Sequence, residues 1–465
     1  MGNNSEENFI SVLIDKFERM LEQNDHYFFD VEEFEEIIDH YFEINDLVKA
    51  LKVIRFGKQQ HPSAIVFLLR EAQLYATTNK VEKALDILKK VEEIDPNNSE
   101  IFMTKGAIYS QLKKYNEAIE EYNKAIEDAE ALDEVYSNIA FEYENLGNHE
   151  KALEYLKKAI KVNPDNQSVL YELAFCFEIT NRTEESIEFF EKYLDINPYS
   201  YVAWYNIGIA FNLMDLFEKS IDAFDFVIAI REDFASAYFN KANSLANLKR
   251  YDEAIKVYEE TFAYEEPDSM THYYIGECFE KLKQYDKAIL NYKKALDLDD
   301  KLPDAWIGIG VCNAEQDNHL EAISFIEKGV SLDPLNSEFW YILADFQFEL
   351  GLIQESISSY KKTCELEPTN PEVWLDYSDV FAESDKYDKA IEIIKIGIEI
   401  QPNNISYLYR FAAYLFLQGR KKEAIIVFSD ALSQNYARHT EILEYSDQLS
   451  NDSCVLELIE TYKNS

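Results

Sequence analysis

The stretch Trp204-Tyr-Asn-Ile-Gly208-Ile-Ala-Phe211, followed twelve residues after its glycine by Ser220, decides the fold of this chain. In it, bulky aromatic side chains stand beside small residues. A related arrangement recurs when the chain is divided into frames of 34 residues, of which the first begins at Val31 and the twelfth at Ile405. A fixed period of this length is typical of a solenoid, in which each repeat packs against its neighbours.

Two positions of the frame are small almost throughout. The eighth is Gly, Ala or Ser in every frame except the first, where it is Ile38. Two small positions twelve residues apart indicate two helices that cross closely. The twentieth position is Ala or Ser in all frames: Ala50, Ala84, Ala118, Ala152, Ser186, Ser220, Ala254, Ala288, Ala322, Ser356, Ala390 and Ala424.

Turn-forming residues separate and end the predicted helices. The fifteenth position often holds Asn, Asp or Gly, which tolerate the left-handed conformation that ends a helix. A proline near the end of the frame closes the second helix because it cannot continue one. These prolines are spaced by 34 residues or a multiple of 34: Pro62, Pro96, Pro164, Pro198, Pro334, Pro368 and Pro402.

The frame resembles the tetratricopeptide repeat, with its W-x2-L-G-x2-Y, A-x3-F and P pattern. Trp204–Phe211 and Trp306–Gly310 carry the resemblance most closely, and Met20–Glu43 is similar to the opening of bacterial multi-repeat proteins of this class. The resemblance implies an all-α fold, a right-handed superhelical α-solenoid of helix-turn-helix repeats. Proline is replaced at four junctions, which we expect to bend differently: Glu130, Glu232, Glu266 and Asp300.

The repeats leave a short segment at each end. We predict a capping helix in residues 1–30, twelve repeats in residues 31–438 and a capping hairpin in residues 439–465. Ser5 is the candidate N-cap of the first helix, whose apolar stripe comprises Phe9, Leu13, Phe17, Met20 and Leu21. In the C-terminal hairpin, one helix is expected to hold Ile442, Leu443, Tyr445 and Leu449, and a second Val455, Leu456, Ile459 and Tyr462.

Composition limits the partners and the compartment. The 465 residues include 45 Lys and Arg against 88 Asp and Glu, a net charge of −43, which disfavours nucleic acid and anionic membranes. Five cysteines are scattered without a Cys-x-x-Cys pair, which is typical of core thiols in a reducing compartment. The start has no signal-peptide pattern and no apolar run is long enough to span a membrane. We therefore expect a cytoplasmic protein.

No sequence motif indicates catalysis. The nucleophile-elbow, P-loop, dinucleotide-binding and zinc-protease patterns are all absent from the sequence. His272 stands at an aromatic position of the frame, which favours core packing. We therefore predict that the protein is not an enzyme and binds no cofactor and no metal.

The resemblance implies that positions five, nine and twelve of each frame face the concave groove of the solenoid. These positions and the neighbouring sixth are rich in aromatic, amide and carboxylate side chains, which would suit an extended, basic, partly apolar peptide. The predicted partner-binding residues are Tyr171, Phe175, Glu178, Tyr205, Asn206, Asn212, Phe239, Asn240, Asn243, Tyr273, Glu277, Glu280, Tyr341 and Asp345.

Two other interpretations stay open. The aromatic and asparagine positions occur in the general repeat pattern, so they can be structural. The chain can also be a structural component that associates with itself through its terminal repeats, or a regulatory subunit of a larger complex. The leading hypothesis is a scaffold or adaptor that holds a protein segment in the groove.

Overall fold

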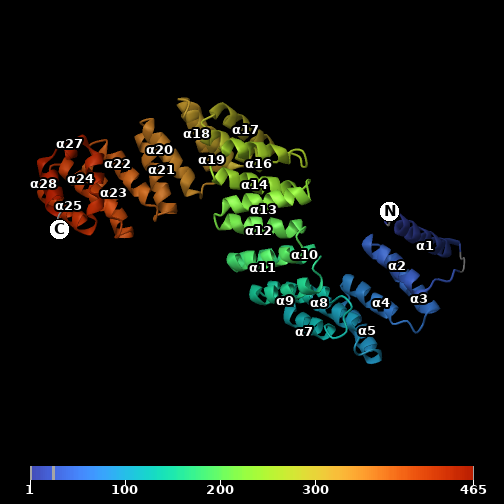
Figure 1. Cartoon of the computed structure of the whole chain (residues 1–465). Helices are drawn as coiled ribbons and strands as arrows, with labels where there is room; N and C mark the ends of the chain where they lie inside the picture. Colours follow the sequence, from blue (N-terminus) through green and yellow to red (C-terminus); the bar gives the residue numbers. More distant parts are fainter. Residues whose placement is uncertain (1–2, 24–26, 464–465) are drawn as a thin grey trace. The chain divides into compact units, whose positions relative to one another are not determined.

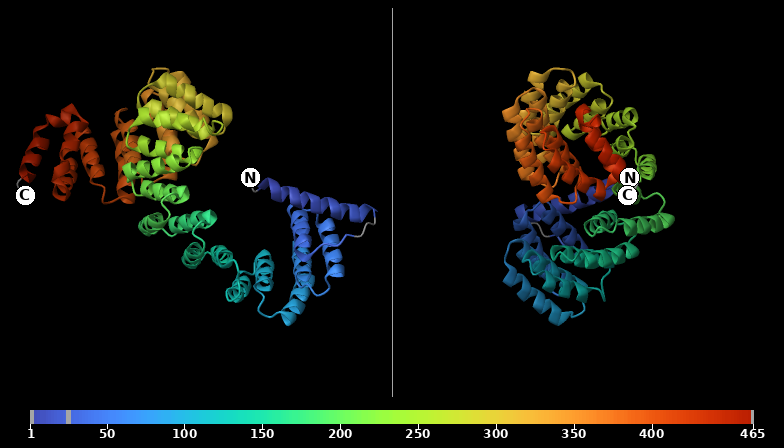
Figure 2. Two further views of the ribbon diagram at one scale, coloured as in Figure 1. Left: turned by 45° about the vertical axis from the view of Figure 1, so that its right-hand side comes forward. Right: turned by 90° about the vertical axis from the view of Figure 1, so that its left-hand side faces the viewer.

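The computed structural model describes residues 3–23 and 27–463. In this part of the chain all regular secondary structure is helical, with 28 α-helices and one short 3₁₀ helix (Figure 1). The packing divides the chain into two compact units, residues 1–231 and 232–465. Within each unit successive helices pack side by side, as two further directions of view also show (Figure 2). The predicted all-α solenoid is confirmed.

The first unit contains an N-terminal helix and six helix pairs. Its helices are α1 (Asn3–Gln23), α2 (Val31–Glu43), α3 (Leu47–Gln60), α4 (Val66–Thr77), α5 (Val81–Ile94), α6 (Ser99–Gln111), α7 (Tyr115–Ala125), α8 (Leu132–Asn145), α9 (His149–Val162), α10 (Gln167–Ile179), α11 (Thr183–Ile196), α12 (Tyr201–Leu213) and α13 (Phe217–Ile230).

The second unit contains six further pairs and a C-terminal segment. Its helices are α14 (Ala235–Asn247), α15 (Tyr251–Thr261), α16 (Ser269–Lys281), α17 (Tyr285–Leu298), α18 (Pro303–Ala314), α19 (His319–Leu332), α20 (Ser337–Glu349), α21 (Ile353–Leu366), α22 (Pro371–Ala382), α23 (Tyr387–Ile400), α24 (Ile405–Leu417), α25 (Lys421–Gln434), η1 (Tyr436–Arg438), α26 (Thr440–Tyr445), α27 (Asp447–Ser450) and α28 (Ser453–Tyr462). Each 34-residue frame of the sequence thus holds one helix pair.

A left-handed residue separates the two helices of every pair. The positive backbone φ angles lie at the fifteenth position of all twelve frames, from 53° at Asn181 to 81° at Gly419. Asn, Asp and Gly were expected there. Lys113, Lys249 and Lys283 adopt the same conformation, although a lysine side chain does not favour it. The close packing of the two helices imposes the turn even where the local sequence disfavours it.

The two small positions lie where the paired helices touch. A Cβ atom added at Gly208 would come within 2.8 Å of the Phe224 ring, and one at Gly276 within 2.7 Å of the Tyr292 ring. At two of the three serines in the twentieth position, Ser220 and Ser356, the hydroxyl reaches the backbone of the other helix. The Ser220 hydroxyl donates a hydrogen bond of 2.8 Å to the carbonyl oxygen of Gly208. The predicted close crossing is confirmed.

Tryptophan at the fourth position of four frames ties those repeats to the turn before them. The indole Nε1–H of Trp204 donates to the carbonyl oxygen of Pro198 at 2.9 Å, and that of Trp340 donates to Pro334 at 3.0 Å. Trp306 makes the same bond to Asp300 at 3.0 Å, although that junction lacks proline. The turn is therefore held by a side-chain bond as well as by backbone stiffness.

Only two of the four junctions without proline change the helices. At Glu130 and Glu266 the preceding helices α7 and α15 have 11 residues, three fewer than the other second helices. At Glu232 and Asp300 the helices keep 14 residues. The second helix is therefore shortened at two of these junctions, and a different bend at the four junctions stays a prediction.

The terminal segments differ from the prediction in detail. Leu13 and Phe17 are buried as expected, whereas the side chain of Phe9 lies outside the described part. Helix α1 is already present at Asn3, so Ser5 lies inside the helix and the N-cap prediction is wrong. The single helix expected around Ile442–Leu449 is also wrong. It is broken at Ser446, whose extended backbone and hydroxyl cap α27 instead.

In the part of the chain that the structure describes, no helix combines the length and apolar character needed to cross a bilayer.

The lysines at the left-handed positions give a stability prediction. Replacing Lys249 or Lys283 by glycine is expected to raise the free energy of unfolding by about 0.5–1 kcal/mol, because glycine adopts a positive φ without steric cost. The matched control, Lys293→Gly within α17, is expected to lower it by about 1 kcal/mol. Urea titration followed by circular dichroism measures both. Equal losses at the two kinds of site would contradict the explanation.

Candidate functional site

Five of the predicted residues gather at one cavity of the first unit. This cavity of about 290 Å³ lies among α10, α11 and α12, and its walls include Tyr171, Phe175, Glu178, Tyr205 and Asn206. Tyr171 and Phe175 are 39% and 51% exposed. Exposed aromatic surface next to a carboxylate can contact an apolar or cationic group of a ligand. We call it the aromatic cavity.

The asparagines are largely engaged by the protein itself. The Asn206 side chain is buried, and its amide donates to the carbonyl oxygen of Leu170 at 3.5 Å. The Asn240 amide donates to the Ser236 carbonyl oxygen at 2.8 Å, one turn earlier in α14. Asn243 accepts a hydrogen bond from the Tyr258 hydroxyl. Asn212 is half-buried and lies outside the wall of the aromatic cavity. Their role toward a ligand stays a prediction.

The rings at the fifth position pack within their own repeats. They are half-buried, except for the more exposed Tyr171 and the buried Tyr409. Five of these rings contact the aromatic ring at the twenty-fourth position of the same frame, 5.6–6.1 Å away between centroids. The pairs are Tyr205–Phe224, Phe239–Tyr258, Tyr273–Tyr292, Tyr341–Tyr360 and Tyr409–Phe428. Because the partner ring covers one face of each, these five rings are less accessible to a ligand than Tyr171.

A second cavity in the other unit is strongly acidic. It measures about 660 Å³ and lies among α16, α18 and α20. The predicted residues Tyr273, Glu277, Glu280 and Asp345 form part of its wall. One ammonium group, that of Lys281, faces seven carboxyl groups there: Glu277, Glu280, Asp304, Glu315, Glu338, Asp345 and Glu349. We call it the acidic cavity.

Burial and repulsion between carboxylates raise the pKa of two carboxyl groups in this wall. Burial raises the pKa of Asp345 to about 6, and the neighbouring Asp376 and Glu349 carboxylates add to the effect. The pKa of Glu277 is also raised, first by burial and then by Glu280 and Asp304. Core tyrosines hold two of these carboxylates in place. The Tyr292 hydroxyl donates to Glu280 at 2.8 Å, and the Tyr360 hydroxyl donates to Asp345.

Two further predicted rings, those of Phe239 and Tyr341, lie apart from both cavities, as do Asn212, Asn240 and Asn243. Phe239 packs against Tyr258 and Tyr274, with each pair of ring centroids 5.6 Å apart. The Tyr341 hydroxyl donates to the Asp376 carboxylate of the next repeat. The contacts with Tyr274 and Asp376 connect consecutive repeats of the second unit. Neither Phe239 nor Tyr341 is part of the wall of the aromatic or the acidic cavity.

A further cavity, of about 960 Å³, contains none of the predicted residues. It lies among α4, α6 and α8 in the first unit. Two sequence signals could have indicated it. The fifth position holds Met103 and Ser137 instead of aromatic residues, and the junction at Glu130 lacks proline. Smaller or more flexible side chains and an altered junction leave more space between consecutive repeats. We call it the polar cavity.

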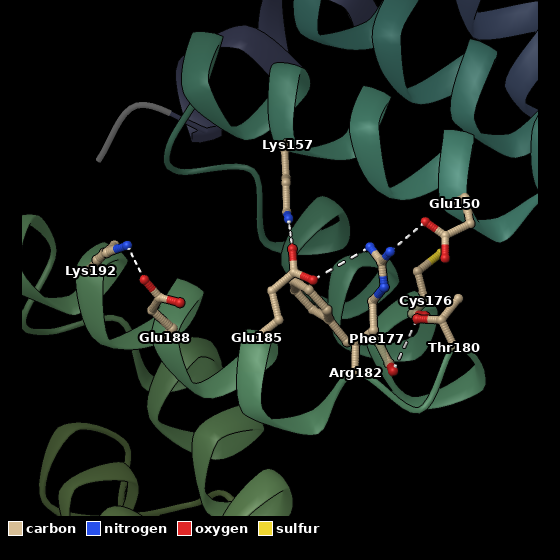
Figure 3. A network of polar contacts seen from close by, with 9 residues as sticks. All are labelled: Glu150, Lys157, Cys176, Phe177, Thr180, Arg182, Glu185, Glu188 and Lys192. Carbon is tan, nitrogen blue, oxygen red and sulfur yellow. Dashed lines mark hydrogen bonds and ion pairs between the residues drawn. The ribbon is translucent and has the colours of Figure 1, made fainter.

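Lys157 of α9 and Lys192 of α11 pair with acids of the same unit (Figure 3). The Lys157 ammonium lies 2.6 Å from the Glu185 carboxylate, and Arg182 bridges Glu150 at 2.7 Å and Glu185 at 3.4 Å. These contacts join α9 to α11. The pairs are substantially exposed, so each contributes little to stability. They neutralise much of the local charge, which leaves the acidic cavity as the stronger electrostatic feature.

Four of the five cysteines and His272 belong to the core, whereas Cys454 is half-buried. Burial raises the pKa of the Cys278 and Cys364 thiols to about 12, so neither is a ready nucleophile. His272 is buried, and its ring centroid lies 5.2 Å from that of Phe262. The core role predicted for His272 is confirmed. Among the described residues no cluster of His, Cys, Asp and Glu is arranged to hold a metal ion.

Comparison with known proteins matches the repeats individually. A sequence model of the tetratricopeptide repeat matches residues 134–166 and 269–302, and a second model of this repeat matches residues 167–200, 235–262 and 337–370. A model of anaphase-promoting complex, cyclosome, subunit 3 matches residues 49–125. No curated protein matches the chain significantly.

Solved structures of repeat proteins are also similar. The APC/C hetero-tetramer Cut9–Hcn1 is 14% identical over 82% of this chain and 89% of that chain, with a TM-score of 0.43. The C-terminal part of a TPR repeat-containing protein from Cytophaga hutchinsonii is 21% identical over 51% and 98%, with a TM-score of 0.44. YrrB, a TPR protein with an unusual peptide-binding site, is 19% identical over 39% and 93%, with a TM-score of 0.32. With repeat models matching five of its helix pairs and the same spacing recurring in all the frames, the chain is a tetratricopeptide repeat protein.

Proposed function

We propose that this protein is a non-catalytic cytoplasmic scaffold whose grooves hold an extended, basic segment of a partner protein. Tetratricopeptide repeat proteins are in general scaffolds for protein interactions, and this chain carries their repeats. The finer proposal concerns the chemistry of the ligand. It rests on one observation, the seven carboxyl groups that surround a single ammonium group in the acidic cavity.

The charge balance of the acidic cavity favours a cationic ligand. Carboxylates that are buried close together repel one another, and the raised pKa values of Asp345 and Glu277 reflect that cost. A lysine or arginine side chain placed among them would supply the missing positive charge. An acidic peptide or a phosphate group would add to the repulsion. The same field would accelerate the approach of a basic partner.

The aromatic cavity would contact the apolar part of such a segment. Phe175 is the more exposed of its two exposed rings, and no ring contact ties it to the core. Rigid aromatic side chains provide contact area at small entropic cost and often dominate a protein interface. Phe175 is therefore a cleaner probe of binding than Tyr205 or Tyr273, whose rings also support their own repeats.

Neutralising the acidic cavity tests the proposal. Glu277→Gln with Glu349→Gln should weaken binding of a short peptide in which lysine alternates with leucine by about three- to tenfold, mainly through slower association. Fluorescence anisotropy and stopped-flow mixing measure these quantities. The matched control is Glu154→Gln with Glu188→Gln, which removes the same net charge from α9 and α11. An equal effect of the two double variants would place the attraction in the overall charge and overturn the proposed site.

The titration of Asp345 gives a pH prediction. Its carboxyl group carries a proton below about pH 6 and loses it above, so the cavity becomes more negative as the pH rises. The affinity for the lysine–leucine peptide is therefore expected to increase as the pH rises through about 6, where lysine stays charged. Asp345→Asn should remove this step, because asparagine does not titrate. An unchanged pH profile in the variant would contradict the assignment.

Self-association is a second candidate function, favoured by an apolar hollow in the last repeats. This hollow of about 570 Å³ lies among α23, α24 and α25, and its wall includes Leu408, Phe411 and Ile426. Ile426 is 70% exposed. If the chain dimerises through this surface, sedimentation should show a concentration-dependent mass that Ile426→Glu abolishes. A constant monomer mass across concentrations would rule this function out.

A further inference from the structure

The polar cavity exists because the repeat is interrupted beside it. Helix α7 ends at Ala125, three residues earlier than most second helices, and the connection to α8 passes along the cavity wall. Asp128 and Glu130 of this connection therefore face the space between the repeats. Met103 stands where an aromatic ring closes the groove in several other frames. The result is a cavity of about 960 Å³.

Two hydroxyl groups in the wall of this cavity make no hydrogen bond to any of the described residues. Thr104 on α6 and Tyr122 on α7 are 6% and 4% exposed, and both are part of the cavity wall. Neither hydroxyl oxygen is among the polar atoms that are fully buried without a partner, so both open to the space of the cavity. A donor group of a ligand in the cavity can therefore reach them, in place of the water that otherwise bonds to them.

Comparison with other repeats shows why the Tyr122 hydroxyl is left free. Tyr258, Tyr292 and Tyr360 stand at the same frame position, and each donates to an amide or carboxylate of its own repeat. These acceptors are at the ninth or twelfth position. In the frame of Tyr122 the ninth position is Ala107, which has no polar side chain, and the twelfth is Ser110, whose hydroxyl bonds to Glu142.

Carboxylates outnumber cations around the polar cavity. Arg70 is held by Asp39 at 3.1 Å and Glu35 at 3.4 Å, so its charge is already balanced within α2 and α4. Glu100 on α6 and Glu134 on α8 are also part of the wall, and among the described residues neither lies within ion-pair distance of a basic group, although burial raises the pKa of Glu100 and the Arg70 charge opposes this rise. Glu142, which is 1% exposed, adds a buried carboxyl group close by, with one oxygen unpaired. An anionic ligand would be repelled here.

We propose that the polar cavity is a separate recognition site for a lysine side chain of an extended peptide segment. The ammonium group would donate hydrogen bonds to the hydroxyl oxygens of Thr104 and Tyr122, with Glu100 and Glu134 supplying the opposite charge. An ammonium group has three donors that point in different directions, which suits separate oxygen acceptors. Arginine presents a planar fork that suits one carboxylate in two-point contact. The site therefore prefers lysine to arginine. This inference rests on the proposed function in that the ligand is a basic protein segment.

The test removes the two hydroxyl groups without changing shape or charge. Thr104→Val with Tyr122→Phe should weaken binding of the lysine–leucine peptide by about tenfold, and should weaken its arginine–leucine counterpart much less. Tyr122→Phe should leave the melting temperature unchanged, because the hydroxyl makes no internal bond. Tyr360→Phe, which removes the bond to Asp345, should lower it. Equal effects of the double variant on the two peptides would overturn the preference for lysine.

Photochemical cross-linking separates this inference from the proposed function. The lysine–leucine peptide, labelled with benzophenone and irradiated on the full chain, should attach to Met103, because a methionine side chain reacts readily and this one is part of the cavity wall. Attachment only within α10–α12 or α16–α20 would overturn the inference and leave the proposed function standing. Absence of saturable binding to any part of the chain would overturn both.

Discussion

The close contact between the two helices of each repeat is the constraint on which the structure depends. At the eighth position of every frame but the first, and at the twentieth position of all frames, the helices carry small side chains, because a ring of the partner helix or its backbone occupies the space. That contact fixes the angle of the pair and therefore the turn between its helices. Lys113, Lys249 and Lys283 adopt a left-handed backbone for this reason, since the packing energy of the pair exceeds the local cost at one residue.

The same contact determines what is presented on the groove side. The bulky residue at the twenty-fourth position lies over the small eighth position and reaches the first helix of its own repeat. There its ring supports the ring at the fifth position, and where it is tyrosine its hydroxyl can hold a carboxylate at the ninth or twelfth. Acidic groups such as Asp345 are thereby fixed in a half-buried place where water screens them poorly. A structural arrangement within each repeat thus creates the charged surface that the proposed function uses.

Departures from the repeat are as informative as its regularity. The three cavities differ because individual frames substitute positions that the helix contact does not constrain. Aromatic residues at the fifth and ninth positions produce the aromatic cavity, and carboxylates produce the acidic one. A shortened helix and missing ring partners produce the polar one. One scaffold thereby carries surfaces of different chemistry without a change in fold.

The sequence alone determined the solenoid, the helix pairs and the left-handed turns, because each arises from contacts repeated every 34 residues. It also indicated that Tyr171, Phe175, Glu277 and Asp345 share groove positions. Only the tertiary structure decided which side chains remain available. The Asn206 amide bonds to the Leu170 carbonyl oxygen, and most fifth-position rings pack against a ring of their own repeat. The local sequence does not reveal these contacts, because the partners lie one helix or one whole repeat away along the chain. The polar cavity and its unpartnered hydroxyls likewise depend on where α7 stops, which a frame position does not specify.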